Sequence, residues 1–393
     1  MGIFPVRKSN IDGVKIIYGI MNGVMFRICC ANFLLVAAVM VQLASIMYVG
    51  RADGVSMRPV SFAVAAFSLG LYAPGPFCSY IVARYQRKSV YMISLLLLVA
   101  ISGIMCFSRD IVSIASIRFL EGAVCGLAQV SLGSTLLNDL TVSERRTLSD
   151  YYFAWSAIFA MPVGVAAAYW AVPVFGFNAV LLASMLMMLF SMLSVMRINV
   201  PFRAPINVKL FSCDRFWQKN DLLPFINLLL LSTTFGMFVA ANHRPMMFLF
   251  AALGVLGAYP LRKMVFTDAD VRAEIVTGMI LVLAALLIPF ATSSPASLHA
   301  AALLFGAGIG LSSSRFLLYF LKMTGHCQRG TAQNTYMLSR ECGYAAGFVS
   351  AFFVPHPAVI AIPMALVSMF FYLAVTHPWF LKHKDRYFKF REV

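Results

Sequence analysis

Long apolar blocks follow one another along almost the whole chain. Blocks such as 94–107 and 276–291 continue without the alternation of apolar and polar positions that a strand of a membrane β-barrel shows. An apolar run of about 18 residues is long enough to cross a bilayer as a helix. The pattern therefore predicts an all-α protein that crosses a membrane many times.

Short segments with polar residues, glycine or proline separate these blocks from one another. An even number of crossings would return the chain to the side on which it began. We predict twelve membrane-spanning helices, over 26–49, 60–83, 90–108, 111–136, 150–172, 176–196, 222–241, 245–264, 274–292, 297–321, 333–353 and 358–378.

The distribution of lysine and arginine gives an independent test of this topology. With both termini in the cytoplasm, the segments on that side carry 24 basic residues and the loops on the other side carry four, Arg51, Arg58, Arg109 and Arg244. Short loops rich in lysine and arginine stay cytoplasmic. We therefore expect an even number of spans, cytoplasmic termini and a place in a bacterial cytoplasmic membrane.

Composition agrees with this topology. Apolar residues make up 61% of the chain, charged residues only 12%, and the mean hydropathy is +0.83. A soluble domain carries about 25% charged residues. The net charge of +16 is explained by basic loops that face anionic lipid head groups, so nucleic acid is not expected as a partner.

Three basic residues stand between the second and third predicted helices: Arg84, Arg87 and Lys88. The stretch 79–88 resembles the loop signature of the major facilitator superfamily, which reads Gly, three residues, Asp-Arg, one residue, Gly and two basic residues. Ser79, Ala83 and Gln86 replace the two glycines and the aspartate. In that family the loop helps to lock one conformation, so the resemblance implies a gating role for the three basic residues.

The fourth and fifth predicted helices resemble the same family. Arg118-Phe119-Leu120-Glu121-Gly122 is similar to the Arg-Phe-aliphatic-polar-Gly pattern of its fourth helix. Pro162-Val163-Gly164 is similar to part of the Gly-Pro-Gly-Gly pattern of its proton-driven efflux members. The resemblance implies two pseudo-symmetric six-helix halves and transport of a small solute by alternating access, with efflux favoured.

Residues in the second half repeat features of the first. Gly306 and Gly310 match Gly122 and Gly126 on spans that lie six apart. Arg146 precedes Gly164 by the same interval that separates Arg329 from Gly347. Repeats of this kind are typical of secondary transporters. We predict an N-terminal half over 1–198, a cytoplasmic linker over 199–221, and a C-terminal half with a basic tail over 222–393.

Five charged residues fall well inside the predicted spans: Arg118, Glu121, Arg315, Arg340 and Glu341. A charge near the centre of a membrane helix costs about 2.5 to 3.5 kcal/mol on insertion scales, and it usually faces a cavity or a partner. If the family resemblance holds, all five lie on helices beside the central cavity. Glu121 and Glu341 are then the candidates for carrying a proton, and the arginines are candidates for binding an anionic solute or for charge pairing.

Spacing separates two cases among these charges. Arg118 and Glu121 are three residues apart and can pair on one helical face, either as a permanent salt bridge or as a proton-coupling pair. Arg340 and Glu341 are adjacent and point about 100° apart, so we expect that they do not satisfy each other. A further partner is then needed, such as Arg315 for Glu341.

Polar and aromatic residues on the same helices are candidates for completing the site, although packing is the alternative for each. They are Asn32, Gln42, Gln129, Trp155, Asn227 and Tyr336. Proline can bend a span or act as a hinge. Such positions occur at Pro74-Gly75-Pro76 on the second helix, at Pro162 on the fifth and at Pro260 on the eighth.

The sequence therefore predicts a secondary transporter of a small, amphipathic or anionic solute, coupled to protons and working as a monomer. No Walker-type Gly-x-x-x-x-Gly-Lys-Ser/Thr segment is present for direct use of ATP, and we expect neither a cofactor nor a metal. The alternatives are a proton symporter or facilitator for uptake, an intramembrane transferase, and a non-transporting receptor on the same fold. The six histidines lie near loops without a paired acid, which disfavours the transferase.

Overall fold

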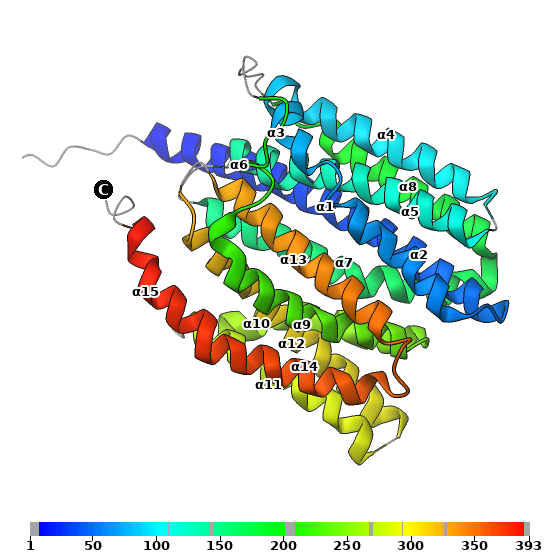
Figure 1. Cartoon of the computed structure of the whole chain (residues 1–393). Coiled ribbons are helices and arrows are strands. Elements are labelled where there is room, and N and C mark those ends of the chain that lie inside the picture. Colours follow the sequence, from blue (N-terminus) through cyan, green and yellow to red (C-terminus); the bar gives the residue numbers. More distant parts are fainter. Residues whose placement is uncertain are drawn as a thin grey trace, which may run out of the picture.

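The computed structural model describes residues 8–108, 110–141, 145–200, 209–266, 270–292, 294–325 and 328–388. Side chains are described throughout these ranges except at 8–22, 134–135 and 384–388. Within these ranges every regular element is a helix, and the helices form one elongated bundle (Figure 1). Part of the predicted linker, 201–208, and the end of the basic tail, 389–393, lie outside the described residues, as do Arg109, His326 and Cys327.

Each of the twelve predicted ranges is occupied by a helix or by consecutive helices. In chain order these are α1 (Lys8–Ala52), α2 (Met57–Gly70), α3 (Gly75–Arg84), α4 (Arg87–Met105), α5 (Ile111–Gln129), η1 (Val130–Leu136), α6 (Leu137–Leu140), α7 (Arg146–Phe175), α8 (Phe177–Met196), η3 (Lys219–Asp221), α9 (Leu222–Ala241), α10 (Pro245–Val265), α11 (Val271–Ala291), α12 (Pro295–Lys322), α13 (Arg329–Ser350), α14 (Pro357–Phe371), η5 (Tyr372–Thr376) and α15 (His377–Phe388).

Among the described residues, ten helices are long and apolar enough to cross a membrane, and α2 with α3 makes an eleventh span if the bent pair is counted as one. This supports an integral, multi-pass membrane protein. The 22-residue α13 is long enough but is not among them, because polar and charged residues line it. The count of twelve spans therefore stays a prediction.

Proline shapes one of these spans visibly. The helix breaks at Pro74-Gly75-Pro76, and α2 and α3 are bent by 44° relative to each other. The predicted bend in the second span is thus present. By contrast, α7 continues through Pro162 and α10 continues through Pro260. Hinge motion at these two prolines stays a prediction.

The end of the fourth predicted span has a feature that the apolar pattern did not indicate. The α-helix α5 passes into a π-helix, η1, before it returns to α-helical geometry in α6. A π-helical turn widens the backbone and is frequently found at functional sites. Residues of α5 and η1, including Gln129 and Gly133, line a pocket in the centre of the bundle.

The helices fall into two groups by their packing. In the first group, α1 packs on α7 and α8, α2 on α5, and α4 on α5 and α8. In the second group, α9 packs on α13 and α14, α10 on α12, and α11 on α12 and α14. The groups meet where α7 contacts α10 and α12 and where α13 contacts α2 and η1; Figure 1 shows them above and below one another.

Close backbone contacts recur at the glycines that suggested a repeat. A Cβ atom at Gly122 would collide with the carbonyl of Phe67 on α2, and one at Gly306 would collide with the carbonyl of Ala251 on α10. Corresponding contacts join α7 to α1 and α13 to α9, with Gly164 against Ala37 and Gly347 against Thr233. A six-helix repeat would produce this pattern, although the division into two pseudo-symmetric halves stays a prediction.

The first turn of α1 and the last turn of α15 lie at the same end of the bundle, as Figure 1 shows. The first turns of α7, α9 and α13 lie there too. We call it the basic end, because Arg84, Arg87, Lys88, Arg146 and Arg329 belong to it. The opposite end carries Arg51, Arg58 and Arg244. The positive-inside rule predicts that the basic end faces the cytoplasm.

We expect Gly306→Ala to lower the free energy of unfolding by about 1 to 3 kcal/mol, because the new methyl group must push α12 away from α10. Gly257→Ala on α10 is the matched control, since a Cβ atom there meets nothing within 4 Å. Thermal unfolding of both variants in detergent measures the difference. Equal unfolding temperatures would contradict the close contact.

Candidate functional site

Three pockets lie between the two helix groups, and Arg340 on α13 lines all of them. The large pocket is lined by Ile158, Met161, Pro162, Leu231, Ser232, Phe235, Ala251, Val255, Gly306, Ile309, Ser313, Arg340 and Tyr344, and its empty space, including the part open to solvent, is about 460 Å³. The middle pocket, with about 350 Å³ of such space, is lined by Asn32, Gln129, Gly133, Phe153, Ala154, Ala157, Gln333, Asn334, Tyr336, Met337 and Arg340. The small pocket, with about 310 Å³ of such space, is lined by Val36, Val39, Met40, Phe67, Leu71, Cys125, Gln129, Met337, Arg340 and Glu341.

One face of α13 supplies the central polar groups. Tyr336, Arg340 and Tyr344 follow one another at intervals of four residues, so they share a face of the helix. Tyr336 and Arg340 were predicted from the sequence, whereas Tyr344 was missed. Its spacing from Arg340 is the signal that could have revealed it. All three side chains are buried.

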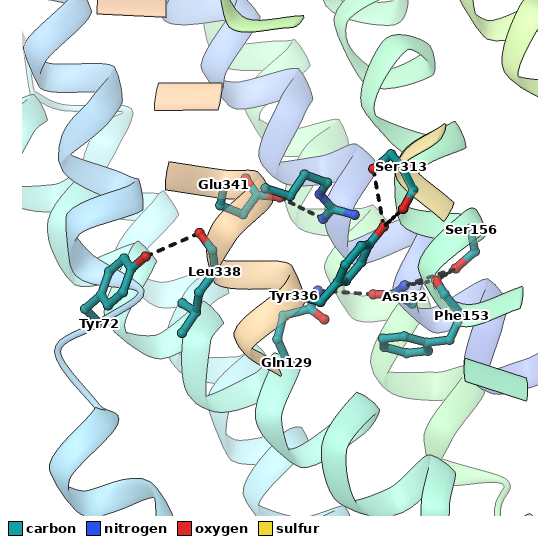
Figure 2. A network of polar contacts seen from close by, with 10 residues as sticks. Asn32, Tyr72, Gln129, Phe153, Ser156, Ser313, Tyr336, Leu338 and Glu341 are labelled. Carbon is teal, nitrogen blue, oxygen red and sulfur yellow. Dashed lines mark hydrogen bonds and ion pairs between the residues drawn. The ribbon is translucent and has the colours of Figure 1, made fainter. Parts of the chain in front are cut away.

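Arg340 and Glu341 pair directly, which corrects the expectation that they do not satisfy each other. The Arg340 Nη2 atom donates to Glu341 Oε1 over 2.8 Å. Adjacent positions diverge at their Cβ atoms, but both side chains are long enough to turn back toward one another. Because both residues are buried, leaving either charge unpaired would cost more than that side-chain conformation. Figure 2 shows Glu341 in this network beside the polar groups of the middle pocket.

Arg315 was considered as a partner of Glu341, and the structure places it elsewhere. Its Nη2 atom donates to Glu274 on α11 over 2.6 Å, and Arg262 on α10 lies 3.7 Å from the same carboxylate. Glu274 is fully buried. The sequence reasoning missed Glu274 because it occupies the first position of a predicted span. None of these three residues lines the pockets described above.

Arg118 and Glu121 form the ion pair that their spacing predicted, with Arg118 Nη1 and Glu121 Oε2 2.8 Å apart. Both are buried, with exposed fractions of 0% and 1%. Ser102 donates to Glu121 over 2.7 Å, and Gln42 accepts from Arg118 over 3.2 Å. These bonds join α1, α4 and α5. The pair does not line any of the three pockets described above, but the guanidinium lies 4.6 Å from the centroid of the Phe67 ring, which lines the small pocket.

Asn32 and Gln129, both predicted site residues, are brought together in the middle pocket. Gln129 Nε2 donates to Asn32 Oδ1 over 3.1 Å, and Asn32 Nδ2 donates to the carbonyl of Phe153 over 2.9 Å. Tyr336 donates to the carbonyl of Ser313 over 3.0 Å (Figure 2). The amides are therefore held in fixed orientations at the wall of the pocket, and they link α1, α5 and α7.

Two further predicted site residues, Asn227 and Trp155, also lie away from the three pockets. Asn227 Nδ2 donates to Thr376 over 3.0 Å, and Asn227 also accepts from Ser368, so it ties α9 to α14 and η5. Trp155 is half-buried and stacks on Phe159 with ring centroids 5.5 Å apart. Their contacts are those of packing and of helix-to-helix hydrogen bonding.

The three basic residues of the predicted gating loop make their described contacts within the first helix group. Arg87 forms an ion pair with Asp139 on α6. Lys88 donates to the carbonyls of Met196 and Ile198 at the end of α8, over 2.7 and 2.8 Å. Arg84 lies 5.7 Å from the centroid of the Tyr80 ring. The contacts of Arg87 and Lys88 tie α4 to α6 and to the end of α8, whereas the contact of Arg84 lies within α3. A gating role for the loop stays a prediction.

A different set of residues connects the two groups at the basic end. Arg329 on α13 donates from Nε to Asp150 on α7 and from Nη2 to Thr147, each over 2.6 Å. The side-chain amide of Gln333 fits with its nitrogen facing two acceptors. In that orientation it donates to Asp150 over 3.1 Å and to the carbonyl of Gly133 over 3.0 Å. Asp150 and Arg329 are both buried. The sequence reasoning used Arg329 only as a marker of the repeat and missed Asp150.

The two groups also touch at the opposite end. Arg51 at the end of α1 donates to the carbonyl of Ala240 at the end of α9 over 2.5 Å. Tyr169 on α7 stacks on Phe248 on α10 with centroids 5.6 Å apart. The three pockets thus lie between two layers of contacts, one at each end of the bundle.

The fold and the site together define a helical, multi-pass membrane protein with buried polar and charged side chains beside pockets between its two helix groups. No protein-family model matches the chain, and no curated protein matches its sequence. Any functional assignment therefore rests on the geometry of the site and on the resemblance in the sequence.

We expect Glu121→Gln to lower the free energy of unfolding by about 3 to 5 kcal/mol, because it leaves the Arg118 guanidinium buried without a counter-charge. The double variant Arg118→Gln and Glu121→Gln removes both charges and should regain most of that loss. Thermal unfolding in detergent measures both. If the single and double variants were equally destabilised, an unpaired charge would not be the cause.

We also expect Asp150→Asn to open the basic end by weakening its contact with Arg329. The reporter is a cysteine at Met337, which lines two pockets, in a background without native cysteines. A water-soluble maleimide should label it several times faster in the Asp150→Asn variant.

Asp139→Asn is the control for this experiment, since the ion pair of Asp139 with Arg87 lies within one helix group. Labelling should remain slow in that variant. Faster labelling with Asp139→Asn and unchanged labelling with Asp150→Asn would show instead that the predicted gating loop, with Arg87, keeps the basic end closed.

Proposed function

We propose that this chain is a secondary active transporter that moves a small solute across a membrane by alternating access. The observation that carries the proposal is the position of the three pockets. They lie between the two helix groups, and each is lined by residues from the first group and from α13 of the second. A site between two packed groups can be exposed to either side in turn if the groups rock about it.

Contacts at both ends support this mechanism. The Arg329 and Asp150 pair joins the groups at the basic end, and the bond from Arg51 to Ala240 joins them at the other. Each set consists of a few polar bonds and ring contacts, so one set can break while the other holds. The recurring helix pairs and glycine contacts add to the resemblance to the major facilitator superfamily.

We further propose that transport is coupled to protons through Glu121 or Glu341. Both carboxylates are buried and each has an arginine partner. Uptake of a proton would release that partner, and the released arginine could then bind elsewhere. Pro162-Val163-Gly164 favours efflux by proton exchange. Uptake by symport is the alternative, and the response to a pH gradient separates the two.

Counterflow in proteoliposomes tests the proposal directly. Vesicles with the purified chain are loaded with a candidate solute, and entry of labelled solute is measured with and without a pH gradient. We expect accumulation of at least one solute from a broad set. Glu341→Gln or Glu121→Gln should abolish the dependence on pH while exchange continues. If no solute moved in any condition, a receptor or an enzyme on this scaffold would be the better explanation.

A further inference from the structure

The side chains that line the large pocket are either apolar or able to donate hydrogen bonds. Most of its surface comes from apolar side chains of α7, α9, α10 and α12, and its polar side chains are Ser232, Ser313, Arg340 and Tyr344. Each of these polar groups can donate a hydrogen bond. None of the described lining residues is acidic. The pocket therefore offers an apolar volume with a donor-rich wall.

Two of these donors have no hydrogen-bond partner in the structure. They are Arg340 Nε and Tyr344 Oη, on residues with exposed fractions of 5% and 2%. Buried polar groups are almost always hydrogen-bonded, and leaving one without a partner is costly. Arg340 and Tyr344 lie one helical turn apart on the same face of α13, and both line the large pocket.

We propose that the large pocket binds the anionic group of a small amphipathic solute at Arg340 and Tyr344, and that one proton on Glu341 accompanies it. This inference rests on the proposed transport function and specifies which class of solute is transported. The apolar walls from α7, α9 and α10 surround the body of the solute. A cationic solute would meet the guanidinium and donor groups in place of an acceptor.

The proton follows from the charge balance at Arg340. Its guanidinium is already paired with Glu341, so the two side chains together are neutral. A bound monoanion adds one uncompensated negative charge to a buried site, which is strongly unfavourable. Arginine does not give up its proton, whereas a carboxylate can accept one. A proton taken from solution by Glu341 restores neutrality and frees Arg340 Nη2 for the anion. Solute and proton then leave together on the other side, so this inference selects symport, the alternative given above, over proton exchange.

The other charged and titratable groups around Glu341 do not replace it in this role. Arg340 and Tyr344 lie on its own helix, and Tyr72 and Cys125 face it from the end of α2 and from α5. Cys125 also lies within electrostatic range of Arg118 and Glu121, which form a neutral pair with each other. Glu341 is thus the carboxylate that contacts Arg340 among the described residues, and it also lines the small pocket.

Binding of three matched probes to the purified full chain in lipid nanodiscs tests the inference by calorimetry. Benzenesulfonate is the anion, benzyl alcohol the neutral analogue and benzylammonium the cation. A sulfonate remains ionised at every pH used, so any pH dependence belongs to the protein. We expect benzenesulfonate to bind at least tenfold more tightly than the other two. Its affinity should rise about tenfold for each unit of pH decrease where Glu341 is ionised in the free protein, since one proton binds with each anion.

Variants separate the roles of the two side chains. Glu341→Gln imitates the protonated acid, so it should bind benzenesulfonate tightly and without dependence on pH. The double variant Arg340→Gln and Glu341→Gln remains neutral and should lose at least tenfold in affinity. The matched control is Arg315→Gln with Glu274→Gln, an ion pair outside the three pockets, which should leave binding and its pH dependence unchanged.

Equal binding of the three probes would overturn the anionic substrate class. Binding of benzenesulfonate without pH dependence in the unaltered chain would overturn the role of Glu341. Proteoliposomes with an internal pH indicator distinguish these failures from failure of transport. Binding of benzenesulfonate without its movement would contradict the proposed transporter and leave the anion site standing. Movement of other solutes without binding of benzenesulfonate would contradict the anion site and leave transport standing.

Discussion

The cost of an unpaired charge among apolar helices explains much of the interior of this protein. Four ion pairs lie within the bundle, and each joins an arginine to a carboxylate at hydrogen-bond distance: Arg118 with Glu121, Arg340 with Glu341, Arg315 with Glu274, and Arg329 with Asp150. Two of the pairs link different helices, α11 with α12 and α7 with α13, and the other two each lie within one helix. Removing the charge of one member leaves the other buried without a counter-charge, which is strongly destabilising. Under the proposed mechanism, protonation of such a carboxylate would release its arginine.

Helix positions and several contacts could be predicted from the sequence, because they depend on local pattern. Apolar length located the helices, and a spacing of three residues predicted the pair of Arg118 with Glu121. Proline predicted the break between α2 and α3. Glycine spacing marked positions where helices approach closely, as at Gly122 and Gly306. Each of these features is set within one helix or one turn of chain.

The missed features depend on how helices meet. Asp150 and Glu274 stand at the first positions of predicted spans, where a charge is ordinary, and only the fold shows that both are buried against arginines from other helices. The pairing of Arg340 with Glu341 was not predicted, because only the directions of their Cβ atoms were considered and not the length of the two side chains. The π-helix η1 leaves no mark in an apolar pattern. Asn227 lies on the predicted helix, but its side chain points toward α14 and η5 and not into one of the three pockets.

The polarity of α13 also bears on how the protein is made. This helix carries Arg329, Gln333, Asn334, Arg340 and Glu341. Transfer of the isolated helix from water into lipid is therefore unfavourable or only weakly favourable. It packs on α9, α12, α2 and η1, all of which are synthesised before it. These neighbours offer the polar partners that lipid lacks. If α13 spans the membrane as predicted, its insertion depends on helices already in place, and the helix at the centre of the candidate site is among the last to be integrated.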